Sequence, residues 1–186
     1  LTVEYRHCEE DALPNEAISS SARGLLRGEQ PRNDGANKMI FLEPSLDLPS
    51  ELDLLEQAAR AALDHQSAHG DLTLVLTDDE QLHRLNRDFL GVDAPTDVLS
   101  FPASETDPET GRRYLGDILL SVSRAETQAR VAGHPLVDEA RLLVVHGVLH
   151  LLGHDHAEAD EKTKMWKAQG EVLALLGLGH VKISEK

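Results

Sequence analysis

The segment His146-Gly-Val-Leu-His-Leu-Leu-Gly-His-Asp-His156 constrains the fold and the chemistry of this chain more than any other. The seven residues before it contain no helix breaker, so a helix is predicted to run into the segment. His146 and His150 are four residues apart and would project from one face of that helix, one turn apart. Gly153 readily adopts the left-handed conformation that ends a helix. The sequence therefore predicts a helix and then a turn that brings His156 back toward the first two histidines.

Three histidines at this spacing are a candidate metal site. Two neutral imidazoles one turn apart can hold a divalent ion, and a third leaves one tetrahedral position open, as in catalytic zinc sites. The alternative is that they are core residues whose ring nitrogens are satisfied by hydrogen bonds. Three histidines in this pattern make that alternative less attractive. His154 competes for the third place, but it follows the glycine directly, where the chain has hardly turned. We predict His146, His150 and His156 as ligands, and zinc as the ion, because hydrolysis requires a Lewis acid without redox chemistry.

The spacing H-x-x-x-H-x-x-G-x-x-H matches the metzincin protease signature at the three ligands and at the glycine. That signature places a glutamate, the general base, directly after the first histidine. Gly147 occupies this position here and has no group that can take a proton. Asp155 is a candidate catalytic residue as a proton acceptor, although it could equally orient a ligand imidazole or be a solvated loop residue. The pattern thus predicts a metal cage without the protease base.

The rest of the chain mixes helical and strand-like patterns. Helices are indicated by apolar stripes behind capping residues, such as Ser50 and the capping box Thr77-Asp-Asp-Glu80, and strands by alternation with period two. The predicted strands cover 39–43, 71–77, 97–101 and 114–121, and the predicted helices cover 51–63, the residues from the capping box to about 89, and about 123–132, 135–152 and 157–176. This order predicts an α+β domain in which a small mixed sheet packs with several helices.

The chain has 186 residues, which predicts one domain with or without a tail. Residues 1–38 are rich in turn formers and show no lasting apolar period, so we expect the functional domain to be 39–186. The segment 1–38 is then either a true extension or an over-long reading of the gene. Cys8 is the single cysteine, which excludes an internal disulfide and favours a reducing compartment. Without a signal-like start or a long apolar run, we expect a cytoplasmic protein with no membrane partner.

The formal net charge is −15, and −13 of it lies in 39–186, because residues 1–38 hold five basic and seven acidic residues. A strongly acidic chain repels nucleic acid at long range, which argues against binding through a broad basic surface. The densest basic group is Lys162, Lys164 and Lys167. It is either a solvated helix face or a local guide for RNA near the histidines.

Three motifs, in order along the chain, resemble the YbeY family of bacterial rRNA maturation endoribonucleases. Residues 146–156 are similar to its H-G-x-L-H-L-x-G-[YH]-D-H signature. Leu85-Asn86 with Asp93-Ala-Pro-Thr-Asp-Val-Leu-Ser-Phe-Pro102 resembles its central L-N-…-D-x-P-T-D-V-L-S-F-P stretch, and Leu115-Gly-Asp-Ile-Leu-Leu-Ser121 resembles its L-G-D-I-x-I-S strand. The likeness spans about Met39 to Gly177.

This resemblance implies a zincin-like single domain of the α+β class with one Zn²⁺ per chain on His146, His150 and His156. It also implies a metal-dependent endoribonuclease, specific for single strands, that acts in ribosome biogenesis. The implied roles are maturation of the 3′ end of 16S rRNA and rRNA quality control. The expected partners are single-stranded RNA, in particular 16S rRNA, with ribosomal small-subunit proteins as further candidates, and neither DNA nor a membrane.

The chain departs from the family pattern at Leu90, where the family usually carries an arginine three residues before the first aspartate of the central motif. Arg87 is the nearest substitute and a candidate catalytic residue, because a guanidinium can clamp a phosphate bidentately; the other interpretation is a solvated helix charge. Two other functions stay open. One is a metzincin-like metallopeptidase, against which Gly147 argues, and the other is a non-catalytic ribosome-assembly factor with a structural metal.

Overall fold

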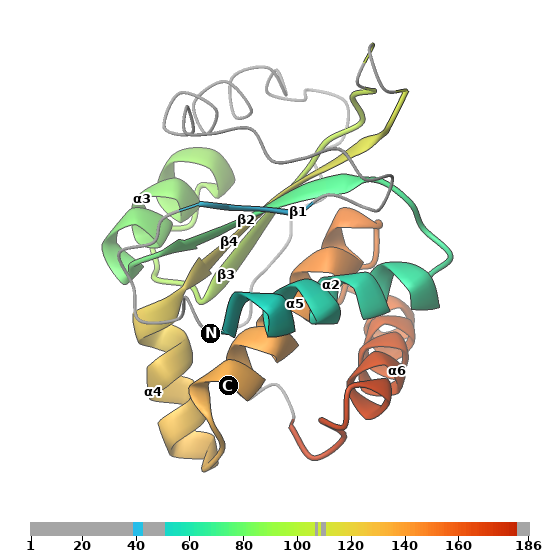
Figure 1. Ribbon diagram of the computed structural model, residues 1–186. Coiled ribbons are helices and arrows are strands. Elements are labelled where there is room, and N and C mark those ends of the chain that lie inside the picture. The colour runs from blue at the N-terminus through green and yellow to red at the C-terminus, as the bar shows by residue number, and fades with distance from the viewer. Residues whose placement is uncertain (1–38, 43–50, 107, 109–110, 182–186) are drawn as a thin grey trace.

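A computed structural model describes residues 39–42, 51–106, 108 and 111–181. It shows one sheet with helices on both faces (Figure 1). The elements are, in order, β1 (Met39–Leu42), α2 (Leu52–His65), β2 (Asp71–Thr77), α3 (Asp79–Leu90), β3 (Val98–Pro102), β4 (Tyr114–Ser121), α4 (Val122–Ala132), α5 (Leu136–Leu151) and α6 (Ala159–Leu175). The α+β class and the mixed sheet predicted from the sequence are confirmed.

The sheet has the strand order β1-β2-β4-β3. β1, β2 and β4 are parallel, whereas β3 pairs antiparallel with β4, so that Val98 lies opposite Leu120 and Pro102 opposite Gly116. Gly116 has a φ of 131°, and a Cβ at this position would collide with the carbonyl oxygen of Phe101. Glycine is therefore required where β4 meets the end of β3.

The helix α5 lies at the centre of the molecule. Twelve of its 16 residues are buried, so it is apolar around most of its circumference, as expected of a core helix. The main core joins α5 to α2, α6 and one face of the sheet, while α3 covers the other face through Leu82, which packs with Leu99 and Leu119 (Figure 1). Polar side chains on α5 are consequently buried and depend on specific partners.

The structure corrects the predicted start of α3. Thr77 is the last residue of β2, and its hydroxyl donates to Gln81 Oε1 at 2.8 Å. Asp78 is the N-cap instead, accepting from the backbone N–H of Gln81 at 2.8 Å. The cap is shifted by one residue because the sheet ladder holds Thr77. At α2 the N-cap is Glu51, and Ser50, the predicted cap, lies outside the described residues, as does the segment 1–38.

None of the helices in the described ranges is both long and apolar enough to cross a membrane.

A buried acid lies in the first turn of α5. Glu139 is 4 % exposed, and its Oε2 is 3.0 Å from Nε2 of His134, which precedes the helix. Burial raises the pKa of Glu139 to about 7, against the opposing effect of His134, and the charge of Asp97 adds to the increase. The carboxyl group is therefore held in its protonated form well above its ordinary range.

This raised pKa has a measurable consequence for stability. Because the folded chain holds this proton more tightly than the unfolded chain, the contribution of Glu139 is fully present below its ordinary pKa of 4.5 and is lost as the pH rises through about 7. Glu139→Gln removes this titration. We therefore expect the Tm difference, variant minus wild type, to increase from pH 5 to pH 8. Glu161→Gln, at an exposed position, serves as the control. Tm curves for Glu139→Gln and wild type that run parallel over this range would contradict the assignment.

Candidate metal centre

The end of α5 and the loop after it bring three histidines together. His146, His150 and His156 each offer one ring nitrogen, and these atoms lie within 4.8 Å of one another. Nε2 of His146 and Nε2 of His150 are 3.0 Å apart. The first two side chains are 4 % and 5 % exposed, and His156 is partly exposed at the rim. In the part of the chain that the structure describes, no other group of three His, Cys, Asp or Glu residues is this close.

A tight turn returns the chain to His156. Gly153 has a φ of 86°, the left-handed conformation expected from the sequence, and the N–H of His154 donates to the carbonyl of Leu149 at 3.0 Å. Asp155 Oδ1 then accepts from the backbone N–H of His156 at 2.6 Å and of Ala157 at 3.3 Å. Asp155, the candidate catalytic residue, is thus placed where its carboxylate shapes the loop that carries the third histidine.

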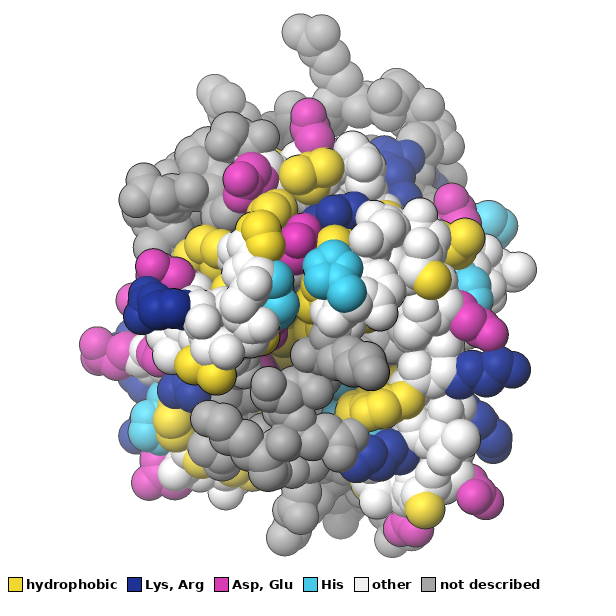
Figure 2. Space-filling view, turned by 90° about the horizontal axis from the view of Figure 1, so that it is seen from below, with side chains coloured by type: hydrophobic (Ala, Val, Ile, Leu, Met, Phe, Trp, Pro, Cys, Tyr) yellow, Lys and Arg dark blue, Asp and Glu magenta, His cyan; other side chains and the backbone are white. Residues whose placement is uncertain are grey.

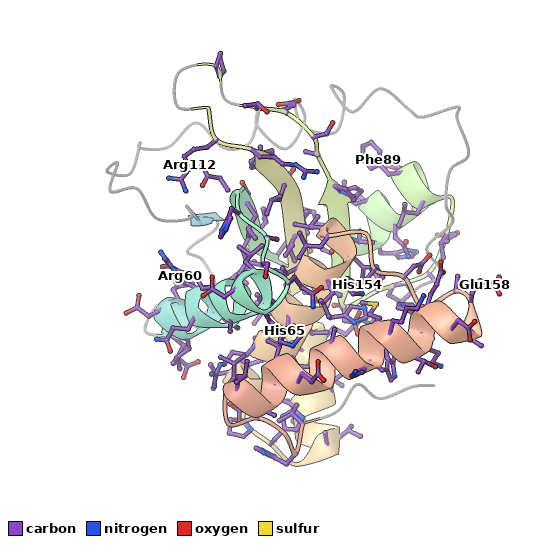
Figure 3. The ribbon with its side chains drawn as sticks, turned by 90° about the vertical axis from the view of Figure 1, so that its right-hand side faces the viewer. Arg60, His65, Phe89, Arg112, His154 and Glu158 are labelled. Atoms are coloured by element: carbon purple, nitrogen blue, oxygen red, sulfur yellow. The ribbon has the colours of Figure 1, made fainter. Side chains whose placement is uncertain are left out.

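His154 is directed to a different partner. Its Nε2 donates to Gln66 Oε1 at 2.9 Å, Gln66 Nε2 donates to Nδ1 of His65 at 2.9 Å, and His65 Nε2 donates to Glu171 at 3.1 Å. Figure 3 shows His65 at the end of α2 and His154 in the loop, both next to α6. This chain of hydrogen bonds has one consistent donor direction, set by the carboxylate at its end. These hydrogen bonds connect the loop after α5 to α2 and α6. His154 is therefore engaged elsewhere and is not one of the three clustered histidines.

The helix α6 supplies a second layer around the histidines. Gln169 is 5 % exposed, and its Oε1 is 3.0 Å from Nδ1 of His146. The ring of Trp166, one turn earlier, has its centroid 5.9 Å from that of His146 and 5.2 Å from that of His156. Gln169 was not among the residues predicted from the sequence. A signal was present, however, because this amide occupies a core position of α6 between Met165 and Val172.

Burial keeps the imidazoles of His146 and His150 neutral. It lowers the pKa of His146 to about 4, although the hydrogen bond that His146 donates to Gln169 opposes the change. Burial also lowers the pKa of His150, and the neighbouring His146 and His156 lower it further. Neutral imidazole is the form that binds metal, and three imidazole nitrogens suit zinc. The donor set therefore fits a zinc ion.

Gly147 faces the sheet. Ser100 Oγ donates to the carbonyl oxygen of Gly147 at 3.2 Å, and a Cβ at this position would lie 2.9 Å from Cγ2 of Ile118 and 3.1 Å from Ser100 Oγ. The position at which the metzincin signature carries its glutamate is thus in contact with β3 and β4. A longer side chain there has no room.

The other candidate residues lie elsewhere. Arg87 is on α3, across the sheet from α5, with 52 % of its side chain exposed, and its Nε donates to Asp88 at 2.9 Å (Figure 1). An RNA phosphate would have to compete with Asp88 for this guanidinium. Leu90 packs against the smaller core beneath α3. Lys162 Nζ lies 5.6 Å from the centroid of the Trp166 ring, the same ring that contacts His146 and His156.

The model of the family described as endoribonuclease YbeY matches residues 46–177. The chain belongs to the YbeY family. A relative named endoribonuclease YbeY from Pelotomaculum thermopropionicum is 45 % identical over 130 residues, which cover 67 % of this chain and 86 % of the relative. Another YbeY relative, from Chloroflexus aurantiacus, is 44 % identical over 151 residues, with 75 % and 98 % covered. The matched range spans the three histidines as well as Gln66 and Gln169.

The fold is also shared with a solved structure. The solution structure of a protein from Thermotoga maritima matches with a TM-score of 0.50 at 24 % identity, and the match covers 80 % of this chain and 99 % of that protein. At this level of identity the comparison shows the common fold of the two chains.

The contact of Gly147 with the sheet can be tested against a second glycine. We expect Gly147→Ala to lose about 1–3 kcal/mol of stability through overpacking against Ile118, which outweighs the gain in helix propensity. Gly170→Ala, in α6, meets no atom within 4 Å and should gain about 0.5–1 kcal/mol. Urea unfolding of both variants measures the difference. Equal stabilisation by the two substitutions would show that Gly147 is not tightly packed.

Proposed function

We propose that this chain is a zinc-dependent endoribonuclease that cleaves single-stranded RNA. The observation that carries the proposal is the cluster of three histidine nitrogens within 4.8 Å in a chain of the YbeY family, whose relatives at 44–45 % identity are named endoribonucleases. His146, His150 and His156 would hold the ion. When bound, zinc supplies a Lewis acid that polarises water or a phosphate oxygen.

The protein's own residues hold this site in shape. Asp155 fixes the turn before His156, and the hydrogen bonds from His154 through Gln66 fasten the same loop to α2 and α6. The ring of Trp166 makes edge-type contacts with His146 and His156 and so helps to hold the two rings in place. In this proposal Asp155 acts on the reaction through the position of His156.

The proposed substrate is the 3′ end of 16S rRNA, processed during ribosome biogenesis and rRNA quality control in the cytoplasm. Ribosomal small-subunit proteins would help to present it, because the net charge of −15 repels free RNA. On the face seen in Figure 2, Lys and Arg side chains are interspersed with Asp and Glu, and the described residues form no continuous basic surface there. Local contacts near the metal, such as Lys162, are then the means by which RNA is held.

The two alternative functions are less well supported. A metallopeptidase of the metzincin type needs a glutamate where Gly147 contacts the sheet. A purely structural metal would be expected to hold helices together, yet α5 and α6 already share a large apolar core. The histidine cluster adjoins that core, and in this proposal the core forms without the ion.

The first test is RNA cleavage by single histidine variants. We expect His150→Ala to lose bound zinc and at least about 100-fold in cleavage of a single-stranded RNA, because loss of a mere partner of a metal ligand already costs about 10–100-fold. His69→Ala, a change at an exposed histidine outside the site, should keep both. Cleavage rates and metal content are measured on the same preparations. Equal cleavage by wild type and His150→Ala would exclude the catalytic role of the metal.

The second test separates a catalytic metal from a structural one. Removal of zinc by a chelator should abolish cleavage, while far-UV circular dichroism and a cooperative thermal transition persist, with a lower Tm because a ligand of the folded state is lost. Addition of zinc should restore cleavage. Loss of the cooperative transition on chelation would support the structural role instead.

A further inference from the structure

The nitrogen with which His146 faces the other two histidines depends on a residue of another helix. His146 Nε2 is 3.0 Å from His150 Nε2, while its Nδ1 is 3.0 Å from Gln169 Oε1. A neutral imidazole carries one proton, on either Nδ1 or Nε2, and only the nitrogen without the proton can bind a metal. The partner of Nδ1 therefore decides whether Nε2 is available.

We propose that Gln169 is a positioning residue that holds the His146 proton on Nδ1 and so keeps Nε2 available as the metal-binding nitrogen. An amide oxygen only accepts hydrogen bonds, so its place opposite Nδ1 requires an N–H there. This inference rests on the metal site of the proposed function and assigns a residue of α6 to it. Partners of this kind around metal ligands commonly change metal affinity by about 10–100-fold.

The surroundings of Gln169 leave it little freedom to take another role. The side chain is 5 % exposed and lies on the buried face of α6, beside Ala168 and one turn from Val172. The contact joins residues that are 23 positions apart, so it forms only when α6 docks against α5. The docking of α6 thereby sets the orientation of the His146 ring as well as its tautomer.

The pair of substitutions Gln169→Leu and Gln169→Glu separates acceptance of a hydrogen bond from packing. Leucine has a similar size and no acceptor, whereas glutamate keeps an acceptor in the same place. We expect Gln169→Leu to weaken zinc binding about 10–100-fold, and Gln169→Glu to bind zinc at least as tightly as wild type. Gln81→Leu, the same chemical change on α3, should leave the affinity unchanged. Zinc affinity is measured on the full chain by competition with a chromophoric chelator.

A second measurement does not depend on the metal or on cleavage. Long-range ¹H–¹⁵N NMR spectra of the zinc-free protein report which nitrogen of a histidine carries the proton. We expect the Nδ1–H tautomer for His146 in wild type and in Gln169→Glu, and a shift toward the Nε2–H tautomer in Gln169→Leu. The wild-type spectrum alone tests the proposal if the leucine variant fails to fold, because an Nε2–H tautomer there would overturn it.

The outcomes distinguish this inference from the proposed function. Equal loss of zinc affinity in the leucine and glutamate variants would assign Gln169 a packing role and overturn the inference, as would wild-type affinity in Gln169→Leu. Neither result would affect RNA cleavage by wild type. Conversely, a wild-type protein that binds zinc and cleaves no RNA would refute the endoribonuclease proposal and leave the tautomer assignment standing.

Discussion

The close contact between α5 and the sheet at Gly147 is the constraint on which the rest of the structure depends. A helix backbone can lie this near to β3 and β4 only where it carries no side chain, and Ser100 donates across the short gap to the carbonyl of Gly147. This contact fixes the rotation of α5 about its axis. With residue 147 turned to the sheet, His146 and His150 are directed toward α6 and the returning loop. Gly147, which stands where the protease signature has its base, thus also orients the histidine cluster.

Burial of α5 gives the site its chemical character. A histidine in water is partly protonated near neutral pH, whereas the low pKa of His146 leaves it neutral at pH 7 and ready to bind a metal. The same burial requires partners for the remaining ring nitrogens, since an unsatisfied polar atom in the core is costly. Gln169 meets this requirement at His146. Burial and hydrogen bonding together therefore prepare the histidines before any ion arrives.

The part of the site that depends on local sequence was predictable. The four-residue spacing of His146 and His150 on a helix and the left-handed turn at Gly153 follow from backbone geometry alone. The amides were not predictable, because Gln66 is 88 positions from His154 and Gln169 is 23 from His146, and only docking of α2 and α6 makes these contacts. The cap of α3 was misplaced by one residue for a related reason: the pairing of β2 with β4 holds Thr77, and sequence patterns do not report strand ends.

The acidic net charge argues against binding of RNA through a broad basic surface, and it does not argue against local binding at this site. Imidazole ligands bind a metal in their neutral form and add no charge, so a bound divalent ion would be a concentrated positive centre in an acidic protein. The most direct test of that centre is X-ray absorption at the zinc edge, with metal content measured on the zinc-loaded full chain. The account predicts one zinc per chain with three imidazole nitrogens at about 2.0–2.1 Å. A chain that retains no zinc, or a zinc without imidazole ligands, would contradict it.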